Sequence, residues 1–464
     1  MTAQTRTEGS AISGAPDSIF AGAVRLTSFG LVVLVTLIAF EAQSVATAMP
    51  TAARDLHGLS AYGWVFSGFL VANVVGLVVS GAMSDRAGPR RPLILGLVTF
   101  CLGLLVAGSA STMTQLIGGR VVQGLGGGLL ITAIYVIIGE SYPTTLRPKI
   151  FAAISSAWVV PSLVGPPLSG FLTQHVTWRA VFLLLAPLVV AGGMLMIPVL
   201  RTLSDHPRSA VAPWSRLTRA LAVALGLAAL VQAGQHPSVA ALIAAGPGAA
   251  ILAWGIVGLV PAGTLRVRRG VPSTVALRGL LAGAMFGAES LIPLALTVQH
   301  GYGPTAAGLP LLGTALAWAL GSWWQGRDAV AAHRTTLIRT AFVLLAVACT
   351  GAAVASVPSA PGWLMYVVWP AAGLGAGLGM SSVGVIMLDL TTDETRGRDS
   401  SALQLSDNAV SAFTTGLGGV LVAAAVHSHL SYTAAFVTAD LVMAGVALIG
   451  LGFAGRARVT PGRR

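Results

Sequence analysis

Fourteen runs of roughly 20 apolar residues follow one another along the chain, and no other feature constrains its fold as strongly. Runs of this length can cross a bilayer as helices, because a helix satisfies its own backbone hydrogen bonds where water is absent. Only 9% of the residues are charged, against roughly 25% in soluble domains. We therefore predict an all-α integral membrane protein with 14 transmembrane helices. The runs begin near Leu26, Gly63, Pro92, Gln115, Lys149, Arg179, Leu217, Ser238, Ser273, Pro304, Arg334, Gly362, Ser401 and Tyr432.

The connections between these runs alternate in charge, which predicts an orientation. "DRAGPRR", "LRPK", "LRVRR" and "ETRGR" are basic, whereas "STMTQ", "GQHPS" and "VPSAPG" contain no lysine or arginine. Because basic loops of membrane proteins stay in the cytoplasm, we expect a multi-pass protein with both termini cytoplasmic. The formal net charge of +12 then reflects topology, and no nucleic-acid partner is expected. Arginine far outnumbers the single lysine, Lys149, which favours a GC-rich bacterial genome and hence the cell membrane.

Neither the cysteines nor the glycines indicate a metal or cofactor site. Cys101 and Cys349 each lie inside an apolar run, as packed free thiols do. The clusters "GLGGG" and "GLGAGLG" superficially resemble a phosphate-binding loop, but that loop needs a preceding strand in a βαβ unit. In a chain of apolar helices, such small residues indicate close helix packing instead.

The chain contains two similar halves. Residues 124–149, "GLGGGLLITAIYVIIGESYPTTLRPK", align without a gap to residues 373–398, "GLGAGLGMSSVGVIMLDLTTDETRGR", and glycines, an acid and two bases recur at matching offsets. We therefore predict two six-helix bundles related as a parallel repeat, with the binding site between them near mid-membrane. The predicted divisions are a cytoplasmic tail over residues 1–25, bundles over 26–200 and 273–455, a connector with two extra helices over 201–272, and a basic tail over 456–464.

Three ionisable side chains are expected at one level of the membrane. Glu41 lies about fifteen residues above Leu26, which at ~1.5 Å per residue is roughly 22 Å, and Glu289 reaches roughly 24 Å above Ser273. The span that contains Arg120 runs the other way and places it roughly 8 Å below the outer edge of a core about 30 Å thick. Ionisable groups inside a membrane are rare and are functional by default.

Two interpretations of these charges are open. A fixed ion pair between Glu41 and Arg120 would only fasten two spans together. A carboxyl group that binds and releases protons as the two bundles move would instead couple transport to a proton gradient. We favour the second interpretation, because Glu289 occupies the position equivalent to Glu41 and has no comparable basic partner in the sequence. The predicted proton-coupling residues are therefore Glu41, Arg120 and Glu289.

Four motifs resemble those of the major facilitator superfamily, and within it the fourteen-span drug:proton antiporters. They are "EAQSVATAMP" in the first span, "GAMSDRAGPRR" after the second, "GGRVVQGLGGG" in the fourth and "PSLVGPPLSG" in the fifth. The chain departs from the family pattern at Glu41, where aspartate is usual, and at Pro161 and Ser169, where glycines are usual. The resemblance implies a cytoplasmic gate and a helix kink. The implied gate residues are Gly81, Asp85, Arg86, Gly88 and Arg90, and the implied kink residues are Gly165, Pro166 and Gly170.

The resemblance implies a secondary active transporter, not an enzyme, that works as a monomer and exports drugs or small molecules in exchange for protons. Two carboxyl groups between the bundles would favour lipophilic cations. An exporter of an endogenous lipid or metabolite would share every one of these motifs. For any single aromatic side chain, helix packing explains the position as well as a substrate contact does. The residues expected to line the substrate site are Phe40, Ser44, Gln123, Trp158, Phe286 and Trp369.

Overall fold

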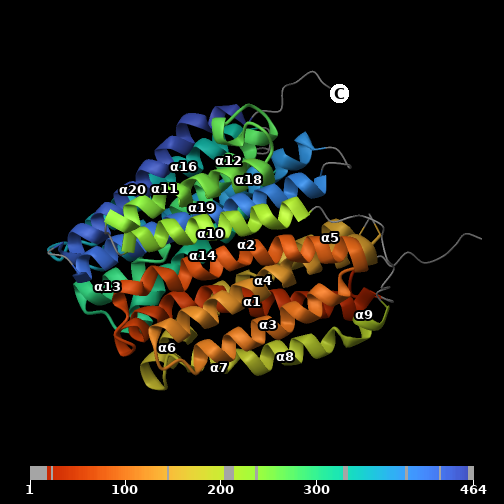
Figure 1. The fold of residues 1–464 in the computed structure, drawn as a ribbon, viewed down its shortest axis with the longest axis horizontal. Coiled ribbons are helices and arrows are strands. Elements are labelled where there is room, and N and C mark those ends of the chain that lie inside the picture. Colours follow the sequence, from red (N-terminus) through yellow and green to blue (C-terminus); the bar gives the residue numbers. More distant parts are fainter. Residues whose placement is uncertain are drawn as a thin grey trace, which may run out of the picture.

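The computed structural model describes residues 18–21, 24–143, 146–202, 214–235, 239–327, 333–391, 396–427 and 430–457, and the regular elements in these ranges are helices (Figure 1). The helices of the first half are α1 (Arg25–Asp55), α2 (Tyr62–Ala87), α3 (Arg90–Gly108), α4 (Met113–Ser141), α5 (Arg147–Ser156), α6 (Val159–His175), α7 (Ala180–Leu183), α8 (Leu185–Leu195) and α9 (Ile197–Thr202). Those that follow are α10 (Trp214–Gln235), α11 (Val239–Leu259), α12 (Val271–Glu289), α13 (Ile292–His300), α14 (Pro304–Gln325), α16 (Arg334–Ala355), α17 (Leu364–Val368), α18 (Pro370–Leu390), α19 (Arg396–His427) and α20 (Tyr432–Phe453). Most of the two predicted tails, residues 1–17 and 458–464, lies outside the described residues.

Within the described residues, 11 helices are long and apolar enough to cross a membrane. They coincide with the predicted spans except for the three that begin near Lys149, Arg179 and Ser238. Those three correspond to α5 with α6, to α7–α9, and to α11, and they are broken into shorter helices or are only partly described. The structure therefore supports an all-helical membrane protein with about 11–14 spans, and the predicted number of 14 is its upper limit.

Successive long helices run in opposite directions, so the molecule has two ends (Figure 1). We call the end next to Arg86, Arg90 and Arg266 the basic face, and the end at which α1 and α6 finish the opposite face. Between the faces, apolar side chains are exposed along helix stripes, as on α3 with Leu95, Val98, Leu102 and Leu105. A bilayer would cover such stripes, because their spacing places them on one side of the helix.

The glycine clusters let helices touch through their backbones. On α4, Gly124 and Gly128 leave no room for a Cβ atom against α2, and Gly126 leaves none against α3. At the equivalent positions of α18, Gly373 and Gly377 contact α14 in the same way, and Gly375 contacts α16. In each half the contacts alternate between two neighbouring helices, which are α2 and α3 in the first half and α14 and α16 in the second. This is the close packing that small residues predict in membrane helices.

The connector helices α10 and α11 pack against each other, and α10 also contacts α2 and α19. In Figure 1, α10 crosses the middle of the molecule between α2, which belongs to the first half, and α19, which belongs to the second. Val223 and Leu227 of α10 share a buried apolar cluster with Val74 of α2 and Leu405 of α19. The connector therefore covers the junction between the two halves on this side.

The two halves are in close contact at the opposite face. Gly63 of α2 and Gly419 of α19 touch backbone to backbone, and so do Gly170 of α6 and Thr305 of α14. The hydroxyl group of Tyr62 donates a 2.8 Å hydrogen bond to the carbonyl oxygen of Ser290, which follows α12. These contacts join the two halves at the opposite face. We call them the opposite-face seam.

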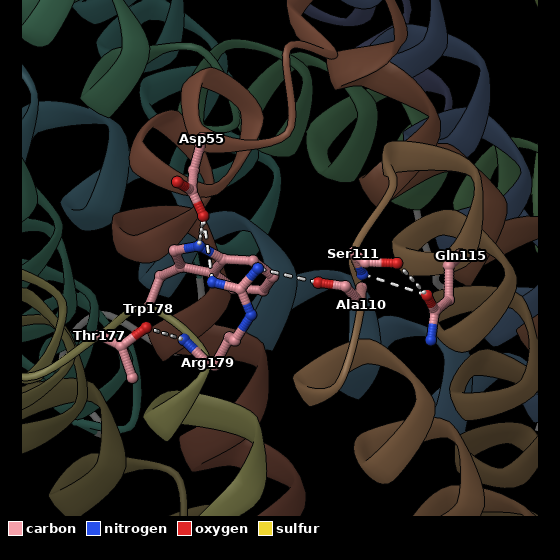
Figure 2. A network of polar contacts seen from close by, with 7 residues as sticks. All are labelled: Asp55, Ala110, Ser111, Gln115, Thr177, Trp178 and Arg179. Atoms are coloured by element: carbon pink, nitrogen blue, oxygen red, sulfur yellow. Dashed lines mark hydrogen bonds and ion pairs between the residues drawn. The ribbon is translucent and has the colours of Figure 1, made fainter.

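A polar network at the opposite face joins three connections of the first half (Figure 2). Asp55, at the end of α1, accepts hydrogen bonds from Trp178 Nε1 at 2.9 Å and from Arg179 Nη1 at 3.0 Å. Arg179 Nη2 donates to the carbonyl oxygen of Ala110 at 3.0 Å, and its guanidinium group lies 4.4 Å from the ring centroid of Trp178. The charge pattern of the connections predicts few arginines at this face. Arg179 is one of them, and Asp55 neutralises its charge.

Breaking this network is expected to loosen the first half without touching its centre. For Asp55→Asn, we expect the free energy of unfolding to fall by about 1 kcal/mol, because Trp178 and Arg179 lose a charged acceptor at a partly exposed site. Thermal unfolding of the purified protein measures this, and Asp389→Asn is the control because Asp389 is exposed and has no ion pair among the described residues. Equal midpoints for the two variants would show that the network does not stabilise the fold.

Candidate functional site

Glu41 and Arg120 form a buried ion pair at the centre of the first half. Arg120 Nη1 of α4 donates to Glu41 Oε1 of α1, and the two residues are 3% and 1% exposed. The two side chains are in contact, as residues at one level of neighbouring helices can be. Taking two charges out of water is costly, and the further contacts of Arg120 offset part of this cost.

Arg120 is held by four groups from three helices. Besides Glu41, its Nε donates to the carbonyl oxygen of Val65 at 3.2 Å, and its Nη1 donates to Gln123 Oε1 at 2.6 Å. The guanidinium group also lies 4.3 Å from the ring centroid of Phe69, at a distance suited to a cation–π contact. Gln123 lies three residues after Arg120 on the same face of α4, which allows this hydrogen bond.

Two polar atoms of this cluster are buried without a partner. Glu41 Oε2 and Gln123 Nε2 make no hydrogen bond to any residue that the structure describes. Buried polar atoms are nearly always satisfied in native proteins, by protein groups or by water. An acceptor and a donor therefore remain available beside the ion pair.

Glu289 lies at the equivalent position of the second half and has a different neighbour. It is the last residue of α12, is 9% exposed, and forms no ion pair with the residues described. The Trp369 indole lies next to the Glu289 carboxyl group, although its Nε1 makes no hydrogen bond of ordinary geometry. Trp369 aligns with Arg120 in the repeat. A carboxyl group thus faces an arginine in one half and a tryptophan in the other.

Three aromatic residues lie in the same part of the second half as Glu289. Trp369 is fully buried at the junction of α17 and α18. Phe286, which precedes Glu289 by three residues on α12, lies 6.4 Å from Trp318 of α14, measured between ring centroids. Both of these rings are half-buried. This part of the second half offers one carboxyl group and several aromatic rings, which is the combination that recognises organic cations.

The span-five motif packs against the segment of α1 that carries Glu41. A Cβ atom at Gly165 of α6 would lie 3.3 Å from Ser44 Oγ, so Gly165 allows α6 to approach α1. Ser169 Oγ donates a 2.7 Å hydrogen bond to the carbonyl oxygen of Ser44, which explains how serine serves where glycine is usual. Pro166 lies inside α6, and Gly170 belongs to the opposite-face seam.

The predicted gate residues lie at the basic face. Asp85 and Arg86 are exposed at the end of α2, and Arg90 begins α3. Gly88 has φ +77°, a conformation that side chains rarely adopt, so the turn between the helices requires glycine there. Asp85 forms no ion pair with the residues described, and a Cβ atom at Gly81 would meet nothing within 4 Å.

The remaining residues predicted to line the substrate site differ in how close they lie to the two carboxyl groups. Phe40 is half-buried on α1, next to Glu41, and its carbonyl oxygen faces Gly165. Ser44 is buried, and its Oγ has no hydrogen-bond partner among the described residues. Trp158 is 39% exposed at the break between α5 and α6. The structure brings the other residues close to the two carboxyl groups but leaves Trp158 at a helix junction.

Sequence reasoning missed the ion pair between Arg278 and Asp407 and a contact between the halves. Arg278 Nε of α12 donates to both carboxylate oxygens of Asp407 of α19 at 2.9 Å. The neighbouring Asn408 donates from Nδ2 to Asn73 Oδ1 of α2, also at 2.9 Å. The sequence signal for this ion pair was the position of Arg278, five residues after Ser273 in the ninth predicted span. This position is at the level of Asp407 in the thirteenth predicted span.

Comparison with known proteins identifies the family. The family model described as Major Facilitator Superfamily matches residues 31–369, more than half of the chain. The chain belongs to the major facilitator superfamily. Among solved structures, the fold matches a mutant of the peptide transporter POT in complex with alafosfalin, with a TM-score of 0.68 over 94% of this chain and 96% of that one. The sequence identity is 15%, so this likeness concerns the fold alone.

The curated relatives within the superfamily include efflux proteins. Multidrug resistance protein 3 of Bacillus subtilis (strain 168) is 30% identical over 182 residues, which is 39% of this chain and 36% of that protein. Efflux pump dotC of Dothistroma septosporum is 31% identical over 179 residues, 38% of this chain and 31% of that pump. The chain thus matches about a third of the length of these relatives. Membership of the superfamily places the chain among membrane transport proteins.

Proposed function

We propose that this major facilitator exports lipophilic, cationic small molecules in exchange for protons, across the cell membrane and with its basic face in the cytoplasm. One observation carries the proposal. Two buried carboxyl groups stand at equivalent positions of the two halves, and only that of Glu41 has a cationic partner among the described residues. The two groups therefore suit different cations, a proton and an organic cation.

The proton site is assigned to Glu41. A proton on its carboxylate removes the negative charge that Arg120 faces. Arg120 then keeps its hydrogen bonds to the Val65 carbonyl oxygen and to Gln123 Oε1, as well as its contact with Phe69. A protonated Glu41 can in turn donate to an acceptor that the ion pair does not use. Protonation thus changes how α1 is fastened to α4 without leaving Arg120 unpaired.

The substrate site is assigned to the neighbourhood of Glu289. A positively charged, apolar molecule would be attracted by its carboxylate and would stack on Phe286, Trp318 or Trp369. The opposite-face seam closes one end of the route between the halves, while Asp85 at the basic face forms no ion pair with the residues described. This arrangement supports a conformation that accepts substrate from the basic face. Export then requires the seam to open.

Substrate transport can be tested in everted membrane vesicles that contain the protein. With a pH gradient imposed, we expect uptake of a fluorescent lipophilic cation, and collapse of the gradient by a proton ionophore should stop it. Uptake that persists after the gradient collapses would contradict proton coupling. Uptake of lipids or neutral metabolites, with none of cationic dyes, would favour the alternative of an exporter for an endogenous compound.

Neutralising Glu289 is expected to affect cations selectively. For Glu289→Gln, we expect the apparent affinity for a cationic dye to fall about tenfold or more, because a buried carboxylate facing a cation contributes at least about 1.4 kcal/mol. Transport assays with a cationic dye and an uncharged one of similar size measure the difference. Glu140→Gln, which changes an exposed glutamate at the basic face, is the control. Equal losses for both dyes would contradict the assignment of Glu289 to the cation.

A further inference from the structure

Three buried hydroxyl groups without hydrogen-bond partners lie between Glu41 and the opposite face. They belong to Ser44 and Thr47 of α1 and to Thr173 of α6, which are 0%, 1% and 8% exposed, and we call them the hydroxyl row. Their side-chain oxygen atoms make no hydrogen bond with any residue that the structure describes, and neither does Glu41 Oε2. Buried polar atoms are nearly always satisfied by protein groups or by ordered water. Four such atoms therefore require an explanation.

Ordinary helix geometry does not satisfy these hydroxyl groups. A serine or threonine inside a helix often donates to a carbonyl oxygen of its own preceding turn. Thr36 of α1 does so, because its Oγ1 donates to the carbonyl oxygen of Val32 at 2.7 Å. Ser44 and Thr47 of the same helix make no such bond within the described part of the chain. Their partners must be sought in the space between the helices.

The hydroxyl row follows the line along which α1, α6 and α14 meet. Glu41, Ser44 and Thr47 are spaced three residues apart, so successive Cβ atoms on the helix surface are about 5–6 Å apart. Ser44 Oγ faces α6, where a Cβ atom at Gly165 would lie 3.3 Å from it. Thr47 Oγ1 faces α14, where a Cβ atom at Gly308 would lie 2.7 Å from it. The row thus passes from the first half to its border with the second.

Thr173 places the end of the row near the surface. It lies four residues after Ser169, which donates to the backbone of α1, and three residues after Gly170, which touches α14. Residues three and four apart are neighbours on a helix, so Thr173 lies between the sides of α6 that meet α1 and α14. The next residue, Gln174, is exposed and accepts a 3.0 Å hydrogen bond from Thr305 Oγ1. The row therefore leads from a buried carboxyl group to the opposite face.

Water molecules suit the spacing of the hydroxyl row. An O–H···O hydrogen bond is about 2.7–2.8 Å long, so one water molecule links two oxygen atoms about 5.5 Å apart. This length is close to the spacing of Glu41, Ser44 and Thr47 along α1. Each hydroxyl group and each water molecule can donate and accept at once. A chain of such groups can pass a proton to a carboxylate.

We propose that the hydroxyl row is a hydrated path along which Glu41 receives its proton from the opposite face. In the conformation described, Gly308 packs against Thr47, so the second half covers the outer part of the row. When the opposite-face seam opens, α14 leaves Thr47 and the row meets the water at that face. Each hydroxyl group and water molecule then takes up one proton and passes one on, and the carboxylate of Glu41 becomes a carboxyl group. Ser44 Oγ accepts the hydrogen bond of that group.

This inference rests on the proposed function, in which Glu41 carries the proton. It adds the side from which the proton arrives and the residues that conduct it. Because the same seam governs substrate release and access to the hydroxyl row, proton uptake occurs only in the conformation that releases substrate. Such a link keeps protons from crossing the membrane without substrate.

Thr47→Val tests the path, because valine has the shape of threonine and lacks its hydroxyl group. Everted vesicles expose the opposite face to their acidified interior. We expect the initial rate of dye uptake to fall about tenfold, since a water molecule of the row loses a hydrogen-bonding partner, while the apparent dye affinity is unchanged. Further acidification of the interior should restore part of the rate, because a higher proton concentration speeds a slow protonation step.

Three further variants make this result specific. Thr173→Val should slow uptake in the same way, and Thr47→Ser, which keeps the hydroxyl group, should transport at nearly the wild-type rate. Thr36→Val is the matched control, because it removes from α1 a hydroxyl group that is bonded to its own helix. Equal uptake rates in Thr47→Val, Thr173→Val and Thr36→Val would overturn the path.

Proton release from the purified protein separates failure of the path from failure of the proposed function. Added dye should release as many protons from Thr47→Val as from the wild type, because the change slows proton movement without removing the carboxyl group of Glu41. Glu41→Gln should release none. If Glu41→Gln releases none but Thr47→Val transports like Thr36→Val, the path alone is wrong. If Glu41→Gln releases protons normally, the proposed function and the path are both wrong.

Discussion

Arg120→Met is expected to lower the free energy of unfolding by about 3–5 kcal/mol, because it leaves Glu41 buried without its partner. Transport is expected to be lost as well. The side chain also contacts the Val65 carbonyl oxygen and the Phe69 ring of α2, so its removal breaks polar contacts that join α4 to α1 and α2. Thermal unfolding in detergent and dye transport in vesicles measure the two effects separately.

A double variant distinguishes a structural role of the pair from a role in transport. In Glu41→Gln with Arg120→Met, both charges are gone, and most of the lost stability should return, since a buried ion pair contributes little net stability. Transport should remain absent if Glu41 carries the proton. A double variant that transports normally would mean that the pair only fastens α1 to α4, which is the alternative interpretation of the sequence.

Gly63→Leu is expected to slow transport by roughly tenfold to a hundredfold, because the side chain prevents α2 from meeting α19 at Gly419. Overpacking of this kind costs about 1–3 kcal/mol, and each 1.4 kcal/mol is about tenfold in population. The cost applies only to the conformation in which the opposite-face seam is closed. The variant should therefore favour the conformation that is open at this face.

Accessibility of the seam measures that shift directly. A cysteine at Thr47, a residue that packs against Gly308 of α14, should react faster with an impermeant thiol reagent when Gly63→Leu is present. Gly118→Leu is the matched control. Gly118 lies near the end of α4 that is at the opposite face, and a Cβ atom there would meet nothing within 4 Å. Equal labelling and equal transport in the two variants would mean that the seam does not gate the transporter.

The features that the sequence predicted well depend on spacing along single helices. The rise per residue predicts a common level for Glu41 and Arg120, and the two side chains are in contact. The glycine clusters indicate packing surfaces because small residues let helices approach closely, and Gly124 and Gly373 have the backbone neighbours that this requires. The repeat aligned Trp369 with Arg120, and the structure places each beside the carboxyl group of its own half.

The features that the sequence did not predict depend on how separate helices rotate against each other. The pairing of Arg278 with Asp407 joins residues 129 positions apart, and no local pattern specifies it. Asp440 is buried on α20, where its Oδ2 accepts from Ser356 at 3.4 Å and its Oδ1 has no described partner. The division of the fifth and sixth spans into short helices was also missed, because apolar periodicity continues across the breaks.

Substrate-induced proton release by the purified transporter tests the central claim most directly. A lipophilic dye cation is added to the wild type, Glu41→Gln and Glu289→Gln in weakly buffered solution, and the change in pH is recorded. We expect the wild type to release protons, Glu41→Gln to release none, and Glu289→Gln to release them only at higher dye concentrations. Unchanged release in both variants would show that neither carboxyl group exchanges a proton for substrate, and the proposed mechanism would be wrong.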